Sequence, residues 1–395
     1  MKKIIVTLLV FILLTGCGYD EFEMPEDAYI NVSENIYEVF DEHSTDELIS
    51  DTNVEILSTT SQIDTDKIGT HSYLLNYKFK KRKYKYNIEY TVIDNIKPIF
   101  IGASNNLIVK VNEENDLCSK IVYADNYDNK PACAVIGDYD LNTIGTYDNL
   151  KYVIKDSSSN EAEKSFNLKV VDTIERNNNP SKPKYLNIDD ILSKYKNDNT
   201  SIGIDISKWQ GNVDFNKVKN TGIEFVIMRI GVQSDKDEDF LTDSKFEEYY
   251  KAAKEANLKI GVYVYNTAIS KDDGIKTAKW VLEKLNGEKL DFPIAYDWEN
   301  WDNFMSYQIS LHTLSESYLS FEKTLKDAGY DSMLYSSKFY LENVWMNYQN
   351  SNIWLAHYTS NTDYKGKYLM WQMTSLAKID GITENTVDID IFYKN

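Results

Sequence analysis

Residues 292–300, FPIAYDWEN, end an apolar run with two acidic residues spaced one residue apart. Residues i and i+2 of a β-strand point to the same face, so Asp297 and Glu299 are expected to project together while Trp298 faces the other way. Two carboxyl groups on one face repel each other, and burial raises their pKa values further. Such a pair can supply a proton donor beside a charge stabiliser. The alternative is an exposed strand end whose acids meet water.

The sequence around this stretch alternates between strand-like and helix-like patterns from about residue 200 to the end. Helical patterns at 245–256, 274–285 and 307–328 lie between the first five strands. This alternation predicts a parallel sheet with helices outside, and eight strands predict a closed barrel that is irregular at its last three strands. The candidate strands are 202–207, 225–230, 260–265, 293–298, 332–336, 353–358, 368–374 and 388–392.

Acidic and aromatic residues gather at the expected carboxyl ends of these strands, where barrels of this kind place their active sites. The acids are Asp205, Asp297, Glu299 and Asp388. Core packing explains any single aromatic residue equally well, and strand alternation means that not all of them can face the interior. The candidates for sugar contacts are Tyr263, Tyr265, Tyr296, Tyr335, Tyr358, Trp371 and Gln372.

Four motifs give the C-terminal region a resemblance to a known family. They are GIDISKWQG at 203–211, IGVYVY at 260–265, P-x-x-x-D-x-E at 293–299, and WQMTS…GI…VDIDIF at 371–392. In this order they resemble glycoside hydrolase family 25, the Chalaropsis-type muramidases, over about 202–393. The resemblance implies an irregular (β/α)5(β)3 TIM-like barrel. It also implies cleavage of the β-1,4 bond between N-acetylmuramic acid and N-acetylglucosamine in peptidoglycan.

The resemblance also assigns roles to the acidic residues. Glu299 is expected to be the general acid, and Asp297 is expected to stabilise the positive charge at C1 and the 2-acetamido group. Asp205 and Asp388 would orient substrate or water. Either the substrate's acetamido oxygen attacks C1, or a base activates water with inversion, and the spacing of the two acids leans toward the first mechanism.

Three further points concern the chemistry of this region. The extra acid Asp390 is a candidate for a structural role, and Arg229 either balances the acidic cluster or pairs with a neighbouring helix. No metal site and no cofactor are predicted, because the four histidines are scattered. Two other functions remain open: a barrel that binds peptidoglycan without cutting it, and a glycosidase that acts on a chitin-like polymer.

The N-terminus has the pattern of a bacterial lipoprotein signal. Lys2 and Lys3 precede a short apolar run that ends in Leu14-Thr15-Gly16-Cys17. This run resembles a lipobox, which implies a signal peptide over 1–16, lipid attachment at Cys17 and a tether over 17–27. We therefore expect an extracytoplasmic protein anchored by lipid to the outer face of the cell membrane.

Two weakly repeated segments follow the tether. DTDKIGT at 64–70 corresponds to DLNTIGT at 140–146, and each segment closes with an alternating run. We expect two immunoglobulin-like β-sandwich modules, at 28–94 and 95–173, which act as spacers. A linker over 174–199, with a weak helix at 188–195, leads to the barrel at 200–395.

Composition limits the partners of the chain. The net charge of −19 argues against nucleic acid. The expected partners are peptidoglycan glycan strands and, through the lipid anchor, the membrane, and we expect a monomer. Cys118 and Cys133 form either a disulfide or a pair of buried thiols, because the sequence does not give the distance between them.

Overall fold

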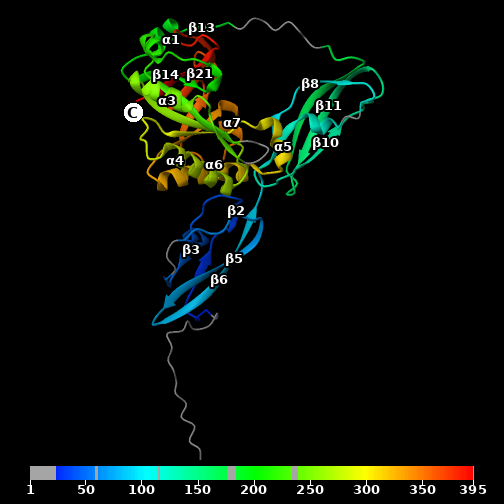
Figure 1. Cartoon of the computed structure of the whole chain (residues 1–395). Coiled ribbons are helices and arrows are strands. Elements are labelled where there is room, and N and C mark those ends of the chain that lie inside the picture. The colour runs from blue at the N-terminus through cyan, green and yellow to red at the C-terminus, as the bar shows by residue number, and fades with distance from the viewer. Residues whose placement is uncertain (1–23, 58–60, 114–115, 176–183, 234–238, 395) are drawn as a thin grey trace, which may run out of the picture. The chain divides into compact units, whose positions relative to one another are not determined.

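The computed structural model describes residues 24–57, 61–113, 116–175, 184–233 and 239–394 (Figure 1). The chain divides into two compact units, residues 1–95 and 96–395, and each is described by itself. The predicted signal peptide, Cys17 and most of the tether lie outside the described residues. Among the residues that are described, no helix is both long enough and apolar enough to cross a membrane.

The N-terminal unit is a small β module. Its long hairpin buries alternate side chains of the second strand, among them Ile88, Tyr90 and Val92, as expected for a half-buried strand. The sheet order is β2-β6-β5-β4, with β2 parallel to β6, and β1 pairs with β3 separately. The elements are β1 (Ile30–Val32), β2 (Ile36–Glu38), the 3-10 helix η1 (Thr45–Leu48), β3 (Ile49–Thr52), β4 (Glu55–Ile56), β5 (Gly69–Phe79) and β6 (Arg82–Ile93).

The second unit begins with a module of the same topology. Its four-stranded sheet has the order β10-β11-β12-β8, with β8 parallel to β12, and β7 pairs with β9. The weak sequence repeat therefore corresponds to a repeated pattern of strand pairing. The elements are β7 (Ile99–Gly102), β8 (Asn106–Lys110), η2 (Leu117–Lys120), β9 (Val122–Ala124), β10 (Ala132–Ile136), β11 (Gly145–Lys155) and β12 (Glu161–Val171).

The prediction of two immunoglobulin-like sandwiches is wrong. The immunoglobulin fold packs an antiparallel sheet of four strands on one of three. Each module here combines a four-stranded sheet with a two-stranded one and contains a parallel pair at the edge of the larger sheet. The alternating sequence pattern predicts that strands exist, but their neighbours are chosen by contacts between distant segments.

A disulfide joins two segments of the second module. Cys118 in η2 and Cys133 in β10 are bonded, with their Cα atoms 6.0 Å apart. The pairing fits the geometry that a disulfide requires. Of the two possibilities left open by the sequence, the structure has the bonded one.

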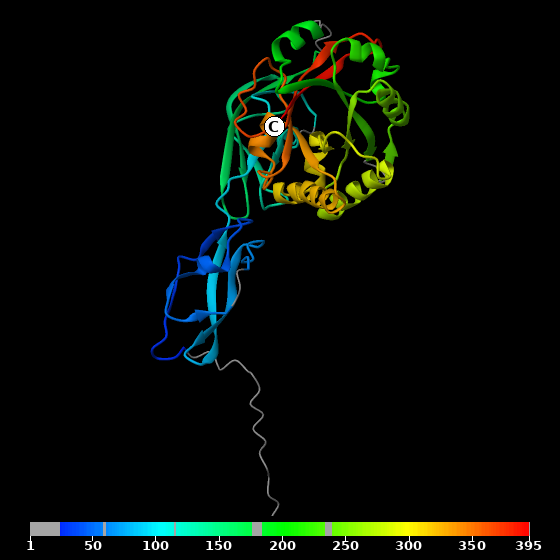
Figure 2. The same ribbon diagram turned by 90° about the vertical axis from the view of Figure 1, so that its left-hand side faces the viewer.

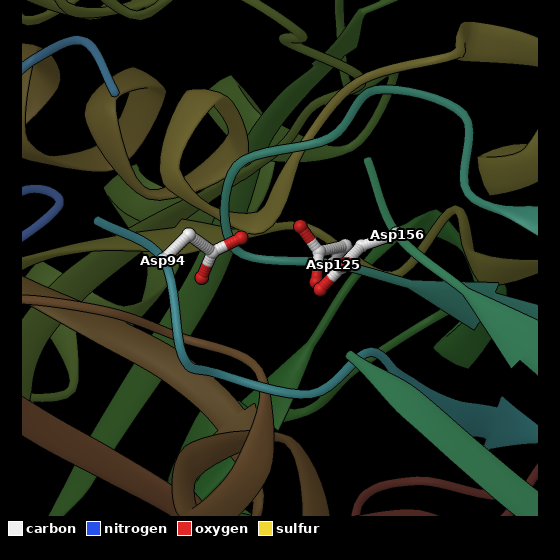
Figure 3. Close-up of side chains that lie close together, drawn as sticks. All are labelled: Asp94, Asp125 and Asp156. Atoms are coloured by element: carbon white, nitrogen blue, oxygen red, sulfur yellow. The ribbon is translucent and has the colours of Figure 1, made fainter. Parts of the chain in front are cut away.

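Two buried aspartates hold neighbouring turns of the same module (Figure 3). Asp125 follows β9 and Asp156 follows β11, and their carboxylate oxygens lie within 4.8 Å of each other. An oxygen of Asp125 accepts the backbone N–H of Asp128 at 2.7 Å, and Asp156 accepts that of Asn160 at 2.7 Å. Both side chains therefore stabilise turns through their own backbone. Asp94, also labelled in Figure 3, belongs to the N-terminal unit.

The rest of the second unit is a barrel with helices on its outer side (Figure 2). Its strands are β13 (Leu186–Asn187), β14 (Thr200–Ile206), β15 (Phe225–Gln233), β16 (Phe240–Thr242), β17 (Lys259–Tyr265), β18 (Ile294–Asp297), β19 (Ser332–Ser337), β20 (Asn352–Ala356), β21 (Met370–Lys378) and β22 (Val387–Tyr393). Its helices are α1 (Ile188–Tyr195), η3 (Lys208–Gln210), α2 (Phe215–Asn220), α3 (Phe246–Glu255), α4 (Lys271–Leu285), η4 (Trp301–Asn303), α5 (Phe304–Tyr307), α6 (Leu311–Asp327) and α7 (Lys338–Asn343).

Eight of these strands close on themselves. The ring runs β14-β15-β17-β18-β19-β20-β21-β22, and β22 then pairs with β14. The first seven strands are parallel, whereas β22 is antiparallel to both of its neighbours. The predicted (β/α)5(β)3 TIM-like fold class is therefore corrected to a closed eight-strand barrel within a mixed ten-stranded sheet, since a TIM barrel requires eight parallel strands.

The burial pattern explains why these segments form a barrel. Every residue of β14 is buried, because one face lines the interior and the other lies beneath helices. In α3 the buried residues Phe246, Tyr249 and Ala253 occupy one helical face, and the opposite face is polar. Sequence pattern alone therefore locates most of the strands and helices here.

The second module is packed against the barrel through the start of α6. Along residues 310–312, the backbone N–H groups donate in order to the side-chain oxygen of Asn129 at 3.0 Å, the backbone oxygen of Asp125 at 2.8 Å and that of Asn126 at 3.2 Å. A helix leaves its first N–H groups without partners inside the helix. The module therefore supplies part of the cap of α6, and Ala124 joins the hydrophobic core of the barrel.

Candidate active site

Strand register places the predicted acids side by side at one end of the barrel. Asp205 at the end of β14 lies opposite Asp388 at the start of the antiparallel β22. Asp297, the last residue of β18, lies beside Tyr335 of β19. Glu299 follows two residues after the end of β18. The carboxyl ends of the parallel strands and the start of β22 therefore meet around one cavity.

This cavity, which we call the acid pocket, has a volume of about 200 Å³. It combines four carboxyl groups with aromatic rings, a mixture that suits a polar ligand with flat apolar faces, such as a sugar ring. Eight of the predicted site residues line it, and Trp354 is an addition. The lining residues are Asp205, Tyr263, Asp297, Glu299, Tyr335, Trp354, Tyr358, Gln372 and Asp388.

Gln372 is the centre of a hydrogen-bond network in the acid pocket. Its side-chain oxygen accepts the hydroxyls of Tyr335 and Tyr358, each at 2.9 Å. Its side-chain nitrogen donates to Oδ2 of Asp205 at 2.8 Å. These bonds fix the amide orientation of Gln372 and connect β14, β19 and β21 across the pocket.

Burial and crowding raise the pKa values of all four acids in the pocket. Desolvation is the largest cause for each, and mutual repulsion between carboxylates adds to it for Asp205, Asp297 and Asp388. The pKa of Asp388 rises to about 9. The surroundings of the cluster therefore favour the protonated forms of its acids, as an acid catalyst requires.

Asp297 and Glu299 differ in their surroundings. Asp297 is buried, and its Oδ1 has no hydrogen-bond partner among the described residues. Glu299 presents an exposed surface at the mouth of the pocket, although dense protein atoms around its carboxyl raise its pKa. Because the two groups repel each other, the pair resists losing both protons. One acid is thus accessible from outside, and the other is held deep with a free acceptor position.

Asp390 and Arg229 lie outside the lining of the pocket. Asp390 is fully buried and accepts the indole N–H of Trp354 at 2.8 Å, which holds that ring in the pocket wall. Arg229 pairs with Asp243, just before α3, at 2.7 Å. Arg229 therefore pairs with the segment next to a helix, as one of its two expected roles requires. Its charge also offsets part of the rise in the pKa of Asp297, which burial and the neighbouring carboxylates cause.

Three predicted sugar-contact residues do not line the acid pocket. Tyr296 lies on the outer face of β18, where its hydroxyl is 2.7 Å from that of Ser317 in α6. Trp371 is buried and donates to the backbone oxygen of His357 at 2.8 Å, and Tyr265 is half-buried at the end of β17. Strand alternation separates Tyr296 and Trp371 from Asp297 and Gln372, their inward-facing neighbours.

Trp354 is the lining residue that was absent from the predicted set. Strand alternation places Trp354 on the same face of β20 as Ala356, but it does not show which face lines the pocket. Its register partner in β19 is Tyr335, a predicted site residue. Its ring also packs against Tyr335 and Tyr263, with centroids 4.8 and 6.2 Å away.

Comparison with known proteins bears on the barrel region. The sequence model of "Glycosyl hydrolases family 25" matches residues 204–382. An "Autolytic lysozyme" of Clostridium acetobutylicum is 30% identical over 194 residues, which cover 48% of this chain and 55% of that protein. The chain thus spans about half the length of this curated relative.

Solved structures of similar proteins were also found. A family 25 glycosyl hydrolase from Bacillus anthracis has a TM-score of 0.45 and 16% identity, covering 55% of this chain and 96% of that one. A bacterial lysozyme from Streptomyces coelicolor has a TM-score of 0.43 and 22% identity, covering 50% and 93%. The sequence matches, with the motifs in family order, show that the C-terminal region of this chain carries a domain of glycosyl hydrolase family 25.

Proposed function

We propose that the barrel is an N-acetylmuramidase, a lysozyme that cleaves the β-1,4 bond between N-acetylmuramic acid and N-acetylglucosamine in peptidoglycan. The observation that carries this proposal is the acid pocket itself. Four carboxyl groups with raised pKa values share a small cavity with aromatic rings at the end of a family 25 barrel. Glycoside hydrolysis needs a protonated carboxyl group and a second acidic group near the same bond.

Glu299 is the proposed general acid. It lies at the mouth of the pocket, where a glycosidic oxygen can approach, and its raised pKa favours the protonated form that must donate. Protonation of that oxygen breaks the bond between it and C1. The aglycone then leaves as an alcohol, and positive charge develops at C1.

Asp297 is proposed to steady that charge through the substrate's own 2-acetamido group. The acetamido oxygen attacks C1, and Asp297 accepts the acetamido N–H with Oδ1, the oxygen without a partner in the described structure. Water then opens the cyclic intermediate and returns a proton to Glu299, so that the anomeric configuration is retained. Asp205, held by Gln372, and Asp388 would orient the sugar and the water.

The proposed location follows from the N-terminal sequence. A lipid on Cys17 would hold the enzyme at the outer face of the membrane, and the two β modules would act as spacers between the anchor and the barrel. Tethering also raises the local concentration of the enzyme near the wall, without any new contact.

The test is digestion of purified peptidoglycan by a soluble chain that starts after Cys17. Mass spectrometry of borohydride-reduced products should show fragments that end in reduced muramic acid. Fragments that end in reduced glucosamine would assign cleavage to the other glycosidic bond and contradict the proposal. NMR of the first-formed anomer separates the mechanisms, because retention supports acetamido participation and inversion excludes it.

A further inference from the structure

A second cavity lies beside the acid pocket, against the segment that enters the barrel. β13 pairs in parallel with the end of β21, at Ala377 and Lys378. α1 follows directly, and Tyr195 at its end packs edge-on against Trp371 with ring centroids 5.8 Å apart. β21 continues past Gln372, the pocket residue, to reach β13. The entering segment therefore forms a wall on the rim that carries the acids.

We call this cavity the side pocket, and its volume is about 400 Å³. Tyr358 lines both the side pocket and the acid pocket, and 58% of its surface is exposed. The two cavities therefore share this tyrosine as a common lining residue. The side pocket is lined by Lys184, Leu186, Asn187, Asp190, Ile191, Lys194, Tyr195, Tyr358, Thr359, Ser360, Met373, Thr374 and Leu376.

The lining of the side pocket differs in chemistry from that of the acid pocket. Its described lining contains one acid, Asp190, and no carboxyl cluster. Its apolar lining includes the buried Ile191 and Met373 and the more exposed Leu376, which together we call the floor. A sugar has hydroxyls around its whole edge, and these would lose hydrogen bonds to water against such a wall. Small methyl groups lose nothing there and gain from burial.

Charge at the rim of the side pocket favours an anionic ligand. The described lining includes two lysines, Lys184 and Lys194, and one acid, Asp190, in a chain whose net charge is −19. The ammonium group of Lys194 donates to the backbone oxygen of Ser360 at 3.0 Å, and an ammonium has three donors. A ligand that combines methyl groups with carboxylates matches both the floor and the rim.

We propose that the side pocket receives the stem peptide attached through the lactyl group of the muramic acid bound in the acid pocket. This inference rests on the proposed muramidase function and adds a recognition element to it. The lactyl group and alanine residues bring methyl groups, and the acidic residue of the stem brings carboxylate. An extended peptide advances about 3.3–3.6 Å per residue, so the stem would lead from the acid pocket past the shared residue Tyr358 into the side pocket.

The experiment compares two substrates with the soluble full chain. One is peptidoglycan with intact stems, and the other is the same glycan stripped of peptides by an amidase. The wild-type kcat/KM should be about tenfold or more higher on the intact substrate, the ratio expected for one well-made anchor. Leu376→Glu, which places a carboxylate on the floor, should bring this ratio close to one.

Control variants separate a specific effect on the side pocket from a general effect of the substitution on the protein. Ile108→Glu makes the same change at an exposed isoleucine of β8 and should keep the wild-type ratio. Lys184→Glu reverses one exposed rim charge and should also lower the ratio, so the proposal does not depend on the folding of the Leu376 variant. Thermal unfolding confirms that each variant is folded.

Binding gives a second readout. The Glu299→Gln chain is titrated with N-acetylmuramyl-L-alanyl-D-isoglutamine and, separately, with N-acetylmuramic acid. The dipeptide should bind at least tenfold more tightly, and Leu376→Glu should remove the difference. Equal affinities, or equal wild-type rates on both glycans, would overturn the stem-peptide proposal while leaving the muramidase intact. Cleavage of neither glycan by the wild type would instead reject the muramidase itself.

Discussion

At the scale of single residues, the acid pocket separates two carboxyl groups that are almost adjacent in sequence. Asp297 ends a buried strand, and Glu299 lies just past it at the mouth of the cavity. The same nine-residue stretch thereby supplies one buried group and one accessible group. The division of labour proposed for catalysis follows from this difference in position.

The first prediction concerns Glu299. Glu299→Gln keeps the shape of the side chain but cannot donate the proton, so kcat on peptidoglycan should fall by about 10²–10⁴-fold with little change in KM. Turbidity loss of cell-wall suspensions, followed at several substrate concentrations, measures both constants. Glu283→Gln, at an exposed acid of α4, is the matched control and should behave as wild type. Full activity of the Glu299 variant would move the acid role elsewhere in the pocket.

The second prediction concerns pH and Asp388. The pKa of this carboxyl is raised from 3.8 to about 9, so at neutral pH the folded protein holds a proton that the unfolded chain has already released. Its contribution to stability is complete below the ordinary pKa and is lost as pH rises toward about 9. The melting temperature should therefore be higher at pH 5 than at pH 8. Asp388→Asn should reduce that difference, whereas Asp272→Asn, at an exposed position of α4, should leave it unchanged.

At the scale of elements, the sequence predicts where helices and strands lie better than it predicts the residues at which they end. The helix expected at 188–195 has those bounds, and the strand expected at 293–298 is β18, Ile294–Asp297. β15 and β21 run longer than predicted because their ends pair with β16 and β13. Those partners are contributed by other parts of the fold, and local pattern does not show them.

The same limit applies to the candidate site, because local pattern does not show which strands lie next to each other. The acids could be placed because strand ends were recognised and carboxyl ends of parallel strands share a rim. The prediction that Tyr296 contacts the sugar is wrong because Tyr296 is next to Asp297, which faces inward. Adjacent residues of a strand point to opposite faces, so Tyr296 faces outward. Trp354 needed the register with Tyr335, which no local pattern gives.

The third prediction tests the cap that the second module gives to α6. Asn129→Ala removes the acceptor for the backbone N–H of Ser310 and should lower the free energy of unfolding by about 1 kcal/mol, as loss of a helix cap does. Denaturant unfolding of the full chain measures the change. Asn105→Ala, at an exposed asparagine of the same module, is the control. An unchanged midpoint for Asn129→Ala would mean that water replaces the bond without loss.

At the scale of the whole molecule, net charge and the proposed lipid tether would act in opposite directions. The net charge of −19 repels walls that carry anionic polymers, while a lipid anchor would keep the enzyme near its substrate. Screening limits the repulsion, since the Debye length is about 8 Å at physiological ionic strength and about 30 Å at 0.01 M.

The fourth prediction follows from this balance. A soluble chain that starts after Cys17 should digest walls with anionic polymers faster at about 0.15 M salt than at about 0.01 M salt. Walls stripped of those polymers should show a much smaller salt effect. The measurement is the rate at which reducing ends are released from each wall preparation at both salt concentrations. A salt effect of equal size on stripped walls would place the repulsion in the glycan or its peptides.

The cap on α6 has a consequence for how this chain can be recombined. Domains can be exchanged between proteins most easily at boundaries that few contacts cross. Here the loop at 124–129 completes the first turn of a core helix, and Ala124 is part of the core. A chimera that joins the barrel to another module would therefore lack the hydrogen-bond acceptors for the first N–H groups of α6. Viable breakpoints in this lineage should lie before the second module, and grafts of this core should carry that module with them.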